Sequence, residues 1–342
     1  KTTTTVMTTA ALAAAGLRPT GIAGGRVAAW GGNLHYESDE LFVVEADEYD
    51  RSFLALSPAI AVVTNMEADH LDIYRDLDDI RETFARFVRP ARAIVLCADD
   101  AGAHSVPLPP GSEVIRYGLG SPDARLVARD VRAAGHSTSF SVLYDGRPIG
   151  EVTLRVPGAH NVRNALAAIG TGLALGVTLD AMREGLSSFG GVERRFQHLC
   201  DVAGITIIDD YAHHPTEIAA TLQAARASYP GRRVIVAFQP HLFTRTRDFC
   251  REFAEALVAA DRILLAEIYP AREQPIAGVT SDLIAAPLGA AGRPVHWRGP
   301  RSSLATALAA AVTPGDVVIT IGAGDITKTG PELKERLLTR ES

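Results

Sequence analysis

The sequence predicts an α/β fold with mostly parallel sheets, and three observations support this prediction. Short apolar runs bounded by turn residues recur along the chain, and stretches of helical periodicity lie between them. Several of these runs are continuously apolar, which is typical of parallel strands buried on both faces. The length of 342 residues is sufficient for two domains.

The first half of the chain begins with a predicted helix and continues with a predicted sheet. The runs that we expect to form buried parallel strands are residues 41–44, 60–63 and 94–96. The helical patterns are residues 2–15, 77–88 and 162–175. Between residues 113 and 156 the pattern alternates with period two, and a turn signal, Asp145-Gly146, separates the runs 139–143 and 151–154. We therefore expect an antiparallel patch attached to the first domain.

The second half repeats the alternation of strands and helices. Its predicted strands are residues 205–208, 234–238, 263–265 and 317–321. Its predicted helices are residues 216–228, 248–259 and 302–311. We place the domain boundary at Gly191, which divides the chain into domains 1–191 and 192–342.

The composition excludes several classes of protein. The chain is 47% hydrophobic, so it has enough apolar surface to offset the chain entropy that keeps disordered segments unfolded. No run of about 18 uncharged apolar residues is present, and the net charge of −6 gives no support for general nucleic-acid binding. The three cysteines are too scattered for a disulfide framework or a metal cluster. A reducing, cytoplasmic setting fits best.

The first residues match the end of a phosphate-binding loop. Lys1-Thr2-Thr3 followed by a helix corresponds to the K-[ST] end of G-x-x-x-x-G-K-[ST], in which lysine contacts phosphates and a hydroxyl contacts Mg²⁺. The glycines would precede residue 1, so we expect the chain to be the downstream part of a longer protein. The alternative interpretation is a frayed, threonine-rich terminus.

Two acidic segments follow predicted strands. Residues 43–50 contain Glu45, and residues 63–72 contain His70 among carboxylates. Because open α/β sheets bind ligands at the carboxyl ends of their strands, we expect Glu45 and His70 at one sheet edge, with oxygen ligands suited to Mg²⁺. The alternatives are a solvated acidic loop and a structural histidine.

Four further polar segments border predicted helices or strands. Residues 157–164 open a helix with His160, Asn161 and Asn164, which either cap the helix or contact a ribose or phosphate. The other three segments are residues 208–217, 238–247 and 320–328. Residues 208–217 contain two adjacent histidines, but no third ligand has the spacing of a zinc site. Arginines in residues 238–247 could clamp a carboxylate or phosphate, or simply form a solvated helix start.

Taken together, these segments resemble the ATP-dependent Mur ligases. The resemblance covers essentially the whole chain in the family's order. It rests on the segments GK-TTT, EADEYD, TNxExDH, HNxxN, GVxRRF, DDYAHHPTE, FQPHxxTRT and GAGDI. It implies a three-domain enzyme of which this chain holds two domains. These are a central P-loop NTPase-like domain, with a mostly parallel sheet plus antiparallel strands, and a Rossmann-like α/β C-terminal domain.

The resemblance also implies a reaction and a set of site residues. L-alanine would be joined to the lactoyl carboxylate of UDP-N-acetylmuramate through an acyl phosphate, with ATP and Mg²⁺, in peptidoglycan precursor synthesis. The residues implied to be catalytic are Lys1, Glu45, His70, Arg195 and Asp210. The nucleotide contacts would be Lys1, Thr2, Thr3, His160, Asn161, Asn164, Arg195 and Asp210. The Mg²⁺ ligands would be Thr2, Glu45 and His70. The substrate contacts would be Tyr211, His213, His241 and Arg245.

Two departures and three alternatives accompany the resemblance. Several family members have arginine where Leu242 stands, and residues 71–90 contain no lysine that could be carbamylated as in sister ligases. The nearest alternative is a murein-peptide recycling ligase, which would add a tripeptide to the same sugar nucleotide, although residues 239–245 favour the alanine-adding members. An alternative of another class is a non-catalytic or regulatory P-loop nucleotide-binding module. The third is a catalytically silent fragment.

Overall fold

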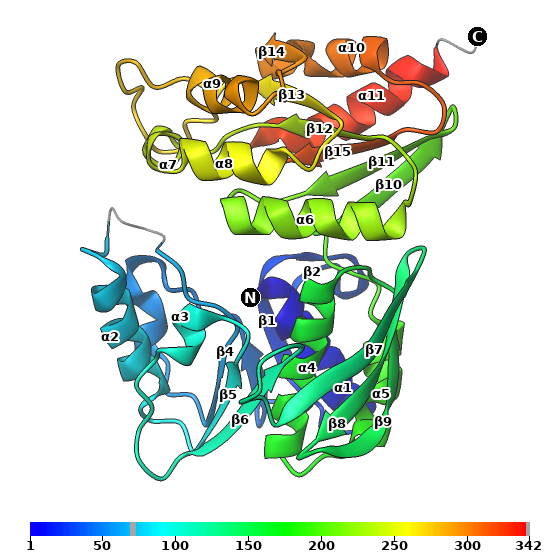
Figure 1. Ribbon diagram of the computed structural model, residues 1–342. Helices are drawn as coiled ribbons and strands as arrows, with labels where there is room; N and C mark the ends of the chain where they lie inside the picture. The colour runs from blue at the N-terminus through cyan, green and yellow to red at the C-terminus, as the bar shows by residue number, and fades with distance from the viewer. Residues whose placement is uncertain (69–72, 340–342) are drawn as a thin grey trace. The chain divides into compact units, whose positions relative to one another are not determined.

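The computed structural model describes residues 1–68 and 73–339, which form two compact units. The first unit is Lys1–Val192 and the second is Glu193–Ser342. Figure 1 shows sheets with covering helices in each unit, so the expected α/β fold class is confirmed. Within the described ranges, no helix has both the length and the apolar character needed to cross a bilayer.

The large sheet of the first unit has six strands in the order β4-β5-β6-β7-β8-β9. Their bounds are Ile60–Val63 (β4), Ala93–Cys97 (β5), Glu113–Gly118 (β6), Leu126–Ala134 (β7), Ser137–Tyr144 (β8) and Arg147–Leu154 (β9). Asp145 and Gly146 make the expected hairpin turn, with φ of 49° and 74°. The antiparallel patch is confirmed for β7 to β9. However, the prediction was wrong for β6, which is parallel to both of its neighbours.

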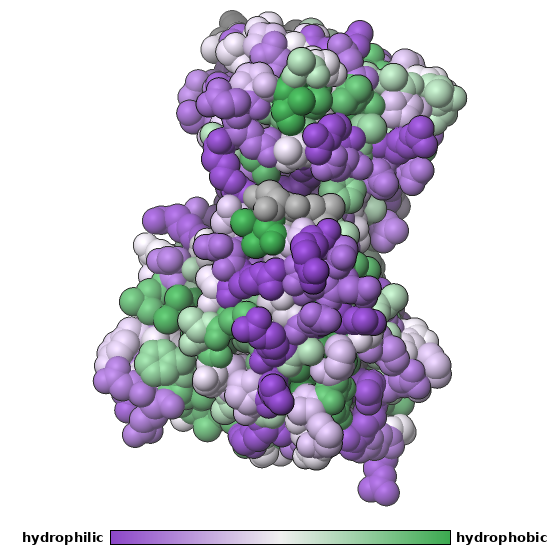
Figure 2. Space-filling model, turned by 90° about the vertical axis from the view of Figure 1, so that its left-hand side faces the viewer, coloured by the Kyte–Doolittle hydropathy of each residue, from purple (hydrophilic) through white to green (hydrophobic). Residues whose placement is uncertain are grey.

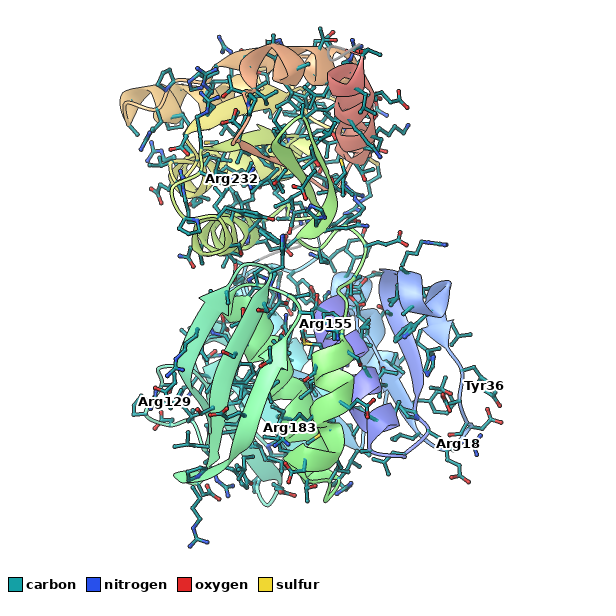
Figure 3. All side chains as sticks on the ribbon, turned by 90° about the vertical axis from the view of Figure 1, so that its right-hand side faces the viewer. Arg18, Tyr36, Arg129, Arg155, Arg183 and Arg232 are labelled. Carbon is teal, nitrogen blue, oxygen red and sulfur yellow. The ribbon has the colours of Figure 1, made fainter. Side chains whose placement is uncertain are left out.

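A small sheet, in the order β2-β1-β3, is the main feature of the first unit that the sequence did not predict. Its strands are Thr20–Val27 (β1), Gly32–His35 (β2) and Phe42–Val44 (β3). Strand β3 was expected to be buried, but the Phe42 and Val44 residues are 51% and 37% exposed. The reason is that β3 pairs only with β1, at the edge of a sheet that is covered by helix α1 on one face. Figure 3 shows Tyr36, just after β2, at the periphery of this unit.

The helices of the first unit pack around α1, which is the helix that begins at the candidate phosphate loop. The bounds are Thr2–Ala14 (α1), Leu77–Val88 (α2), Ala101–His104 (α3), Ala159–Ala174 (α4) and Leu179–Ser188 (α5), with 3-10 turns at Ala28–Trp30 (η1) and Tyr49–Ala55 (η2). Threonine and alanine side chains let α4 and α5 approach α1 closely. A Cβ at Gly185 of α5 would lie 2.1 Å from the Ala10 carbonyl oxygen of α1. Helix α1 is therefore held rigidly on several sides.

The second unit is a doubly wound six-stranded sheet in the order β10-β11-β15-β12-β13-β14. The bounds are Gln197–Val202 (β10), Ile205–Asp210 (β11), Val234–Phe238 (β12), Arg262–Ala266 (β13), Trp297–Gly299 (β14) and Val317–Ile321 (β15). All neighbouring strands are parallel except the edge pair β10–β11. The central strands are apolar on both faces because each face packs against helices.

Helices cover both faces of this sheet, with α6 and α8 on one side and α10 and α11 on the other (Figure 1). The helices are Pro215–Ser228 (α6), Phe243–Asp248 (α7), Cys250–Leu257 (α8), Asp282–Ala290 (α9), Arg301–Ala311 (α10) and Thr329–Leu338 (α11), and Asp325–Lys328 forms a 3-10 turn (η3). The helix predicted over 248–259 corresponds to α8, which is two residues shorter at each end, whereas α7 was not among the predicted helices. Helix α7 carries Arg245, one of the predicted site residues.

Candidate functional site

The first candidate site lies at the start of α1. Lys1 is the N-cap residue, no side chain of the described residues caps the helix, and its first turn carries no acidic residue. The free N–H groups and the helix dipole of such a terminus attract anions. The Lys1 ammonium lies 3.0 Å from an Asp47 carboxylate oxygen and also contacts Glu48. Burial lowers the pKa of Lys1, but Glu48 and Asp47 outweigh it and raise the pKa above its usual value. The ammonium is therefore charged at neutral pH.

A hydroxyl and a carboxylate meet beside this lysine. Thr2 Oγ1 donates a hydrogen bond of 2.9 Å to Glu45 Oε1, and the Gly24 backbone N–H donates to Glu45 Oε2. A Cβ at Gly24 would lie 3.0 Å from Glu45 Oε2, so glycine permits this close approach. Thr3 is half-buried in the same turn. Hydroxyl and carboxylate oxygens are the hard ligands that Mg²⁺ prefers, so Thr2 and Glu45 fit such an ion.

A network behind the acidic loop supports Asp47 and Glu48. The Tyr74 hydroxyl donates to the Glu48 carbonyl oxygen at 2.6 Å, and the Arg51 guanidinium lies 4.9 Å from the centre of the Tyr74 ring. Arg51 in turn donates to Asp79 Oδ2 at 2.7 Å. Sequence reasoning missed this support, because aromatic and charged residues 26 to 28 positions apart carry no local pattern.

The predicted metal ligand His70 lies outside the described residues, as do its neighbours 69–72. The strands that precede Glu45 and His70 along the chain, β3 and β4, belong to different sheets rather than to one sheet as expected. Glu45 follows β3 of the small sheet, whereas the segment that contains His70 follows β4 of the large sheet. Among the residues that the structure describes, no three His, Cys, Asp or Glu side chains are grouped as a metal site.

The polar first turns of α4 are hydrogen-bonded to α1. Asn161 Nδ2 donates to the Pro157 carbonyl oxygen at 2.7 Å, and Asn164 Nδ2 donates to Asn161 Oδ1 at 3.3 Å. Thr4 Oγ1 donates to Asn164 Oδ1 at 2.9 Å, so Asn164 lies against the first turn of α1. His160 is half-buried at the start of α4. The N-cap residue of α4 is Gly158 and no side-chain cap hydrogen bond is present among the described residues, so the capping alternative is not realised. Asn164 lies near the lysine end of α1.

The second candidate site gathers at the carboxyl ends of β11 and β12 in the second unit. Asp210 ends β11, and its buried carboxylate accepts hydrogen bonds from the backbone N–H groups of Phe196 and Ala212. Burial raises the pKa of Asp210 to about 6, against the opposing effect of Arg195. The Arg195 guanidinium lies 3.5 Å from Glu217 and 5.1 Å from the centre of the Tyr211 ring. Arg195, Asp210 and Tyr211 are therefore close neighbours.

The adjacent Asp209 has a different role. Its buried carboxylate accepts hydrogen bonds from Arg194 Nε and from the hydroxyls of Thr320 and Thr327. Arg194 also donates to the Gly322 carbonyl oxygen. Of the two consecutive aspartates, Asp209 thus fastens the last loop of the unit to β11.

Two histidines of the site are neutral at pH 7. The His213 ring lies 5.3 Å from Tyr211 and 6.0 Å from His241, between ring centres. Burial lowers the pKa of His213, and burial together with His213 and Arg245 lowers the pKa of His241 to about 4. His241 Nδ1 is buried and has no hydrogen-bond partner in the described part of the chain. This unsatisfied nitrogen, on a ring beside His213, is a candidate hydrogen-bond partner for a substrate group.

Glu217 was not among the predicted site residues, although it lies inside one of the quoted segments. It accepts hydrogen bonds from the backbone N–H groups of His213 and His214, and it completes a capping box at the start of α6. Burial alone would raise the pKa of Glu217, but His213, Arg195 and these N–H groups lower it to about 2. A glutamate three residues into a helix is the signal that identifies such a box.

Helix α7 brings a buried arginine to the same place. Arg245 is only 7% exposed, and its charge contributes to the lowered pKa values of both His213 and His241. Leu242, which stands where several family members have arginine, is 6% exposed and has a φ of +70°. Its side chain is therefore packed inside the unit. The structure thus brings Arg195 together with the five predicted site residues between positions 208 and 247. These are Asp210, Tyr211, His213, His241 and Arg245. The face of the molecule drawn in Figure 2 is mostly hydrophilic, with hydrophobic patches between the hydrophilic residues.

Comparisons with known proteins cover both units. Residues 1–172 match the Mur ligase middle domain, and residues 194–324 match the Mur ligase glutamate ligase domain. The chain is 43% identical over 341 residues to the UDP-N-acetylmuramate–L-alanine ligase of Salinibacter ruber, covering 98% of this chain and 72% of that protein. It is 45% identical over 342 residues to the enzyme of that name from Geotalea uraniireducens, covering 98% and 74%.

A solved structure agrees with these relatives. The UDP-N-acetylmuramate–alanine ligase MurC of Thermotoga maritima superposes with a TM-score of 0.83 at 29% identity. The match covers 99% of this chain and 74% of that one.

Proposed function

The chain belongs to the Mur ligase family, and from this premise we propose that it acts as a UDP-N-acetylmuramate–L-alanine ligase. The reaction joins L-alanine to the lactoyl carboxylate of UDP-N-acetylmuramate in peptidoglycan precursor synthesis, and converts ATP to ADP and phosphate. The observation that carries the proposal is the grouping of Lys1, Thr2 and Glu45 at an uncapped helix start, in a chain 43–45% identical to enzymes of that name.

The first unit is proposed to bind ATP through the start of α1. The charged Lys1 would exchange its contacts with Asp47 and Glu48 for the phosphates, and Thr2 and Thr3 would add hydroxyls. His160, Asn161 and Asn164 would contact the remainder of the nucleotide. The substrate carboxylate attacks the γ-phosphorus and ADP leaves, which gives an acyl phosphate. The ammonium offsets negative charge that accumulates in that step.

Mg²⁺ would be held by Thr2 and Glu45, and by His70 in the family's pattern. When bound, the ion reduces repulsion between the substrate carboxylate and the phosphates. The fit of Thr2 and Glu45 rests on their 2.9 Å hydrogen bond, which places two hard oxygens together.

The second unit is proposed to orient the acceptor carboxylate and L-alanine. Arg245 supplies a buried positive charge for a carboxylate, and Tyr211 lies against His213. Alanine must lose an ammonium proton before its nitrogen can attack the acyl phosphate. The lowered pKa values of His213 and His241 keep both imidazoles neutral at pH 7, so each can offer an unprotonated ring nitrogen as a hydrogen-bond acceptor to the substrates. Arg195 and Asp210 are proposed to contact ATP.

We place the reaction in the cytoplasm, where ATP is made. The three cysteines are free thiols, as a reducing compartment allows. This location remains a proposal that rests on substrate supply and cysteine usage.

A coupled assay of ADP release by the complete natural protein tests the proposed function. Release should require UDP-N-acetylmuramate and L-alanine together, because the acyl phosphate forms only on the first and is consumed only by the second. Equal release with either substrate omitted would contradict ligase activity, because ATP would then be hydrolysed without forming the amide. Replacing L-alanine with the tripeptide in the same assay distinguishes the recycling ligase. No release under any condition would favour the non-catalytic nucleotide-binding module or the catalytically silent fragment.

A further inference from the structure

A carboxylate from outside every quoted segment contacts the turn that carries His241 and Arg245. Glu273 lies in the loop that follows β13. Its Oε2 accepts hydrogen bonds from the backbone N–H groups of Phe243 and Thr244, and its Oε1 accepts one from the Thr244 hydroxyl. One side chain thus satisfies two N–H groups in the first turn of α7.

This turn has an unusual backbone. Leu242 immediately precedes α7 with a φ of +70°, a left-handed conformation that leucine rarely adopts. It lies directly between His241 and the residues that Glu273 contacts. Such a conformation persists only when surrounding contacts determine it. Removing those contacts should release the turn and shift the residues on both sides.

The same loop contacts the turn at a second place. The Leu242 backbone N–H donates to the Tyr269 carbonyl oxygen at 3.0 Å, and the Tyr269 N–H donates to the Pro240 carbonyl oxygen at 2.8 Å. The Tyr269 ring stacks on the His241 imidazole with 5.8 Å between ring centres and 15° between planes. Tyr269 therefore holds the residues before Leu242, and Glu273 holds those after it.

We propose that Glu273 is a positioning residue that sets the places of His241 and Arg245, and through them the binding of L-alanine. The part that concerns alanine rests on the proposed function. A carboxylate suits this position because all three of its partners are donors, and an ionised carboxylate only accepts. Glutamine keeps one accepting oxygen but turns an NH₂ group toward a donor, so it should preserve the turn only in part.

The test compares Glu273→Ala and Glu273→Gln with Glu255→Ala, a matched removal of an exposed glutamate on α8. In the complete protein, Glu273→Ala should raise the KM for L-alanine about tenfold or more, because sub-ångström displacement of positioning groups has effects of this order. The KM for ATP should change less than about twofold, since the contacts of Lys1 and Thr2 are untouched. Glu273→Gln should lie between Glu273→Ala and the wild type.

Two further measurements make the outcome decisive. Imidazole NMR signals of His241 should shift in Glu273→Ala and stay unchanged in Glu255→Ala, whatever reaction the protein catalyses. Unshifted His241 signals, or a KM for L-alanine equal to that of Glu255→Ala, would overturn the positioning role. If Glu273→Ala does not fold, Glu273→Gln decides by the same two criteria. Failure of the wild type to require L-alanine would instead overturn the proposed function, and the NMR result would still stand.

Discussion

At the scale of single residues, the site contains acidic groups whose pKa values are shifted in opposite directions. Burial and neighbouring charges cause these shifts. Asp210 and Glu217 are both carboxylates at the end of β11 or the start of α6, yet the pKa of the first rises to about 6 and that of the second falls to about 2. Burial acts on both in the same direction. Arg195 and two backbone hydrogen bonds also act on both, so the difference arises because Glu217 faces His213, whereas Asp210 faces the negative charge of Glu217. Composition alone cannot distinguish the two.

The lowered pKa of His241 predicts a specific pH dependence of stability. An unfolded histidine binds a proton near pH 6.5, whereas folded His241 binds it only near pH 4. The free energy of unfolding should therefore decrease as the pH falls from 6.5 to 4, because the unfolded state gains protons first. Replacing His241 with glutamine should remove about one proton's worth of this slope.

Thermal melting of His241→Gln and wild type across that pH range measures the effect. His104→Gln, at an exposed histidine, is the matched control. The raised pKa of Asp210 opposes the trend between pH 6 and 4, so the difference between variants is the quantity to compare. An unchanged slope in His241→Gln would contradict the lowered pKa.

At the scale of helices and strands, the prediction from sequence succeeded where the local pattern and the tertiary environment agree. Helix α2 and strands β4, β12 and β15 have the predicted bounds, because apolar runs and caps such as Asp76 mark their ends. The small sheet was missed because β1 is rich in glycine, which lowers its apparent strand propensity. Helix α8 was predicted to begin two residues early and α7 was not predicted, because the break between them at Phe249 involves neither glycine nor proline.

The same limits apply to the candidate site. Motif residues such as Lys1, Glu45, Asp210 and His241 could be predicted because they occur in recognisable strings. The contacts of Asp79 with Arg51, and of Glu273 with α7, join distant segments through backbone geometry, and no spacing in the sequence encodes them.

At this scale, replacing two helical glycines with alanine should change the free energy of unfolding in opposite directions. Gly185→Ala should destabilise the first unit by about 3 kcal/mol, since the new Cβ would lie 2.1 Å from the Ala10 carbonyl oxygen and force α5 away from α1. Gly289→Ala in α9 meets nothing within 4 Å, so alanine's higher helix propensity should stabilise that helix by up to about 1 kcal/mol. Chemical denaturation measures both. Equal effects of the two substitutions would contradict the close α1–α5 approach.

At the scale of the whole molecule, the buried apolar residues form separate clusters that do not mix the two units. One cluster belongs to the first unit, and two clusters on opposite faces of the second sheet belong to the other. Each unit thus has its own hydrophobic core. A length of about 150 residues is sufficient for independent folding.

Residues 193–342 expressed alone are therefore expected to fold. The fragment should show one cooperative thermal transition by circular dichroism, because its sheet is covered on both faces by its own helices. A fragment with helical signal but no cooperative transition would contradict the independence of this core. Fragment 193–342 carrying Phe253→Ala, which truncates a fully buried side chain, should melt at a distinctly lower temperature.

The chain's two tryptophans belong to different units. Trp30 follows β1 in the first unit and Trp297 begins β14 in the second, and the sequence contains no other tryptophan. Each unit thus has one intrinsic fluorophore. Substituting either indole with phenylalanine leaves a single emitter that reports on one unit alone, so ligand titrations can be followed unit by unit without an added dye.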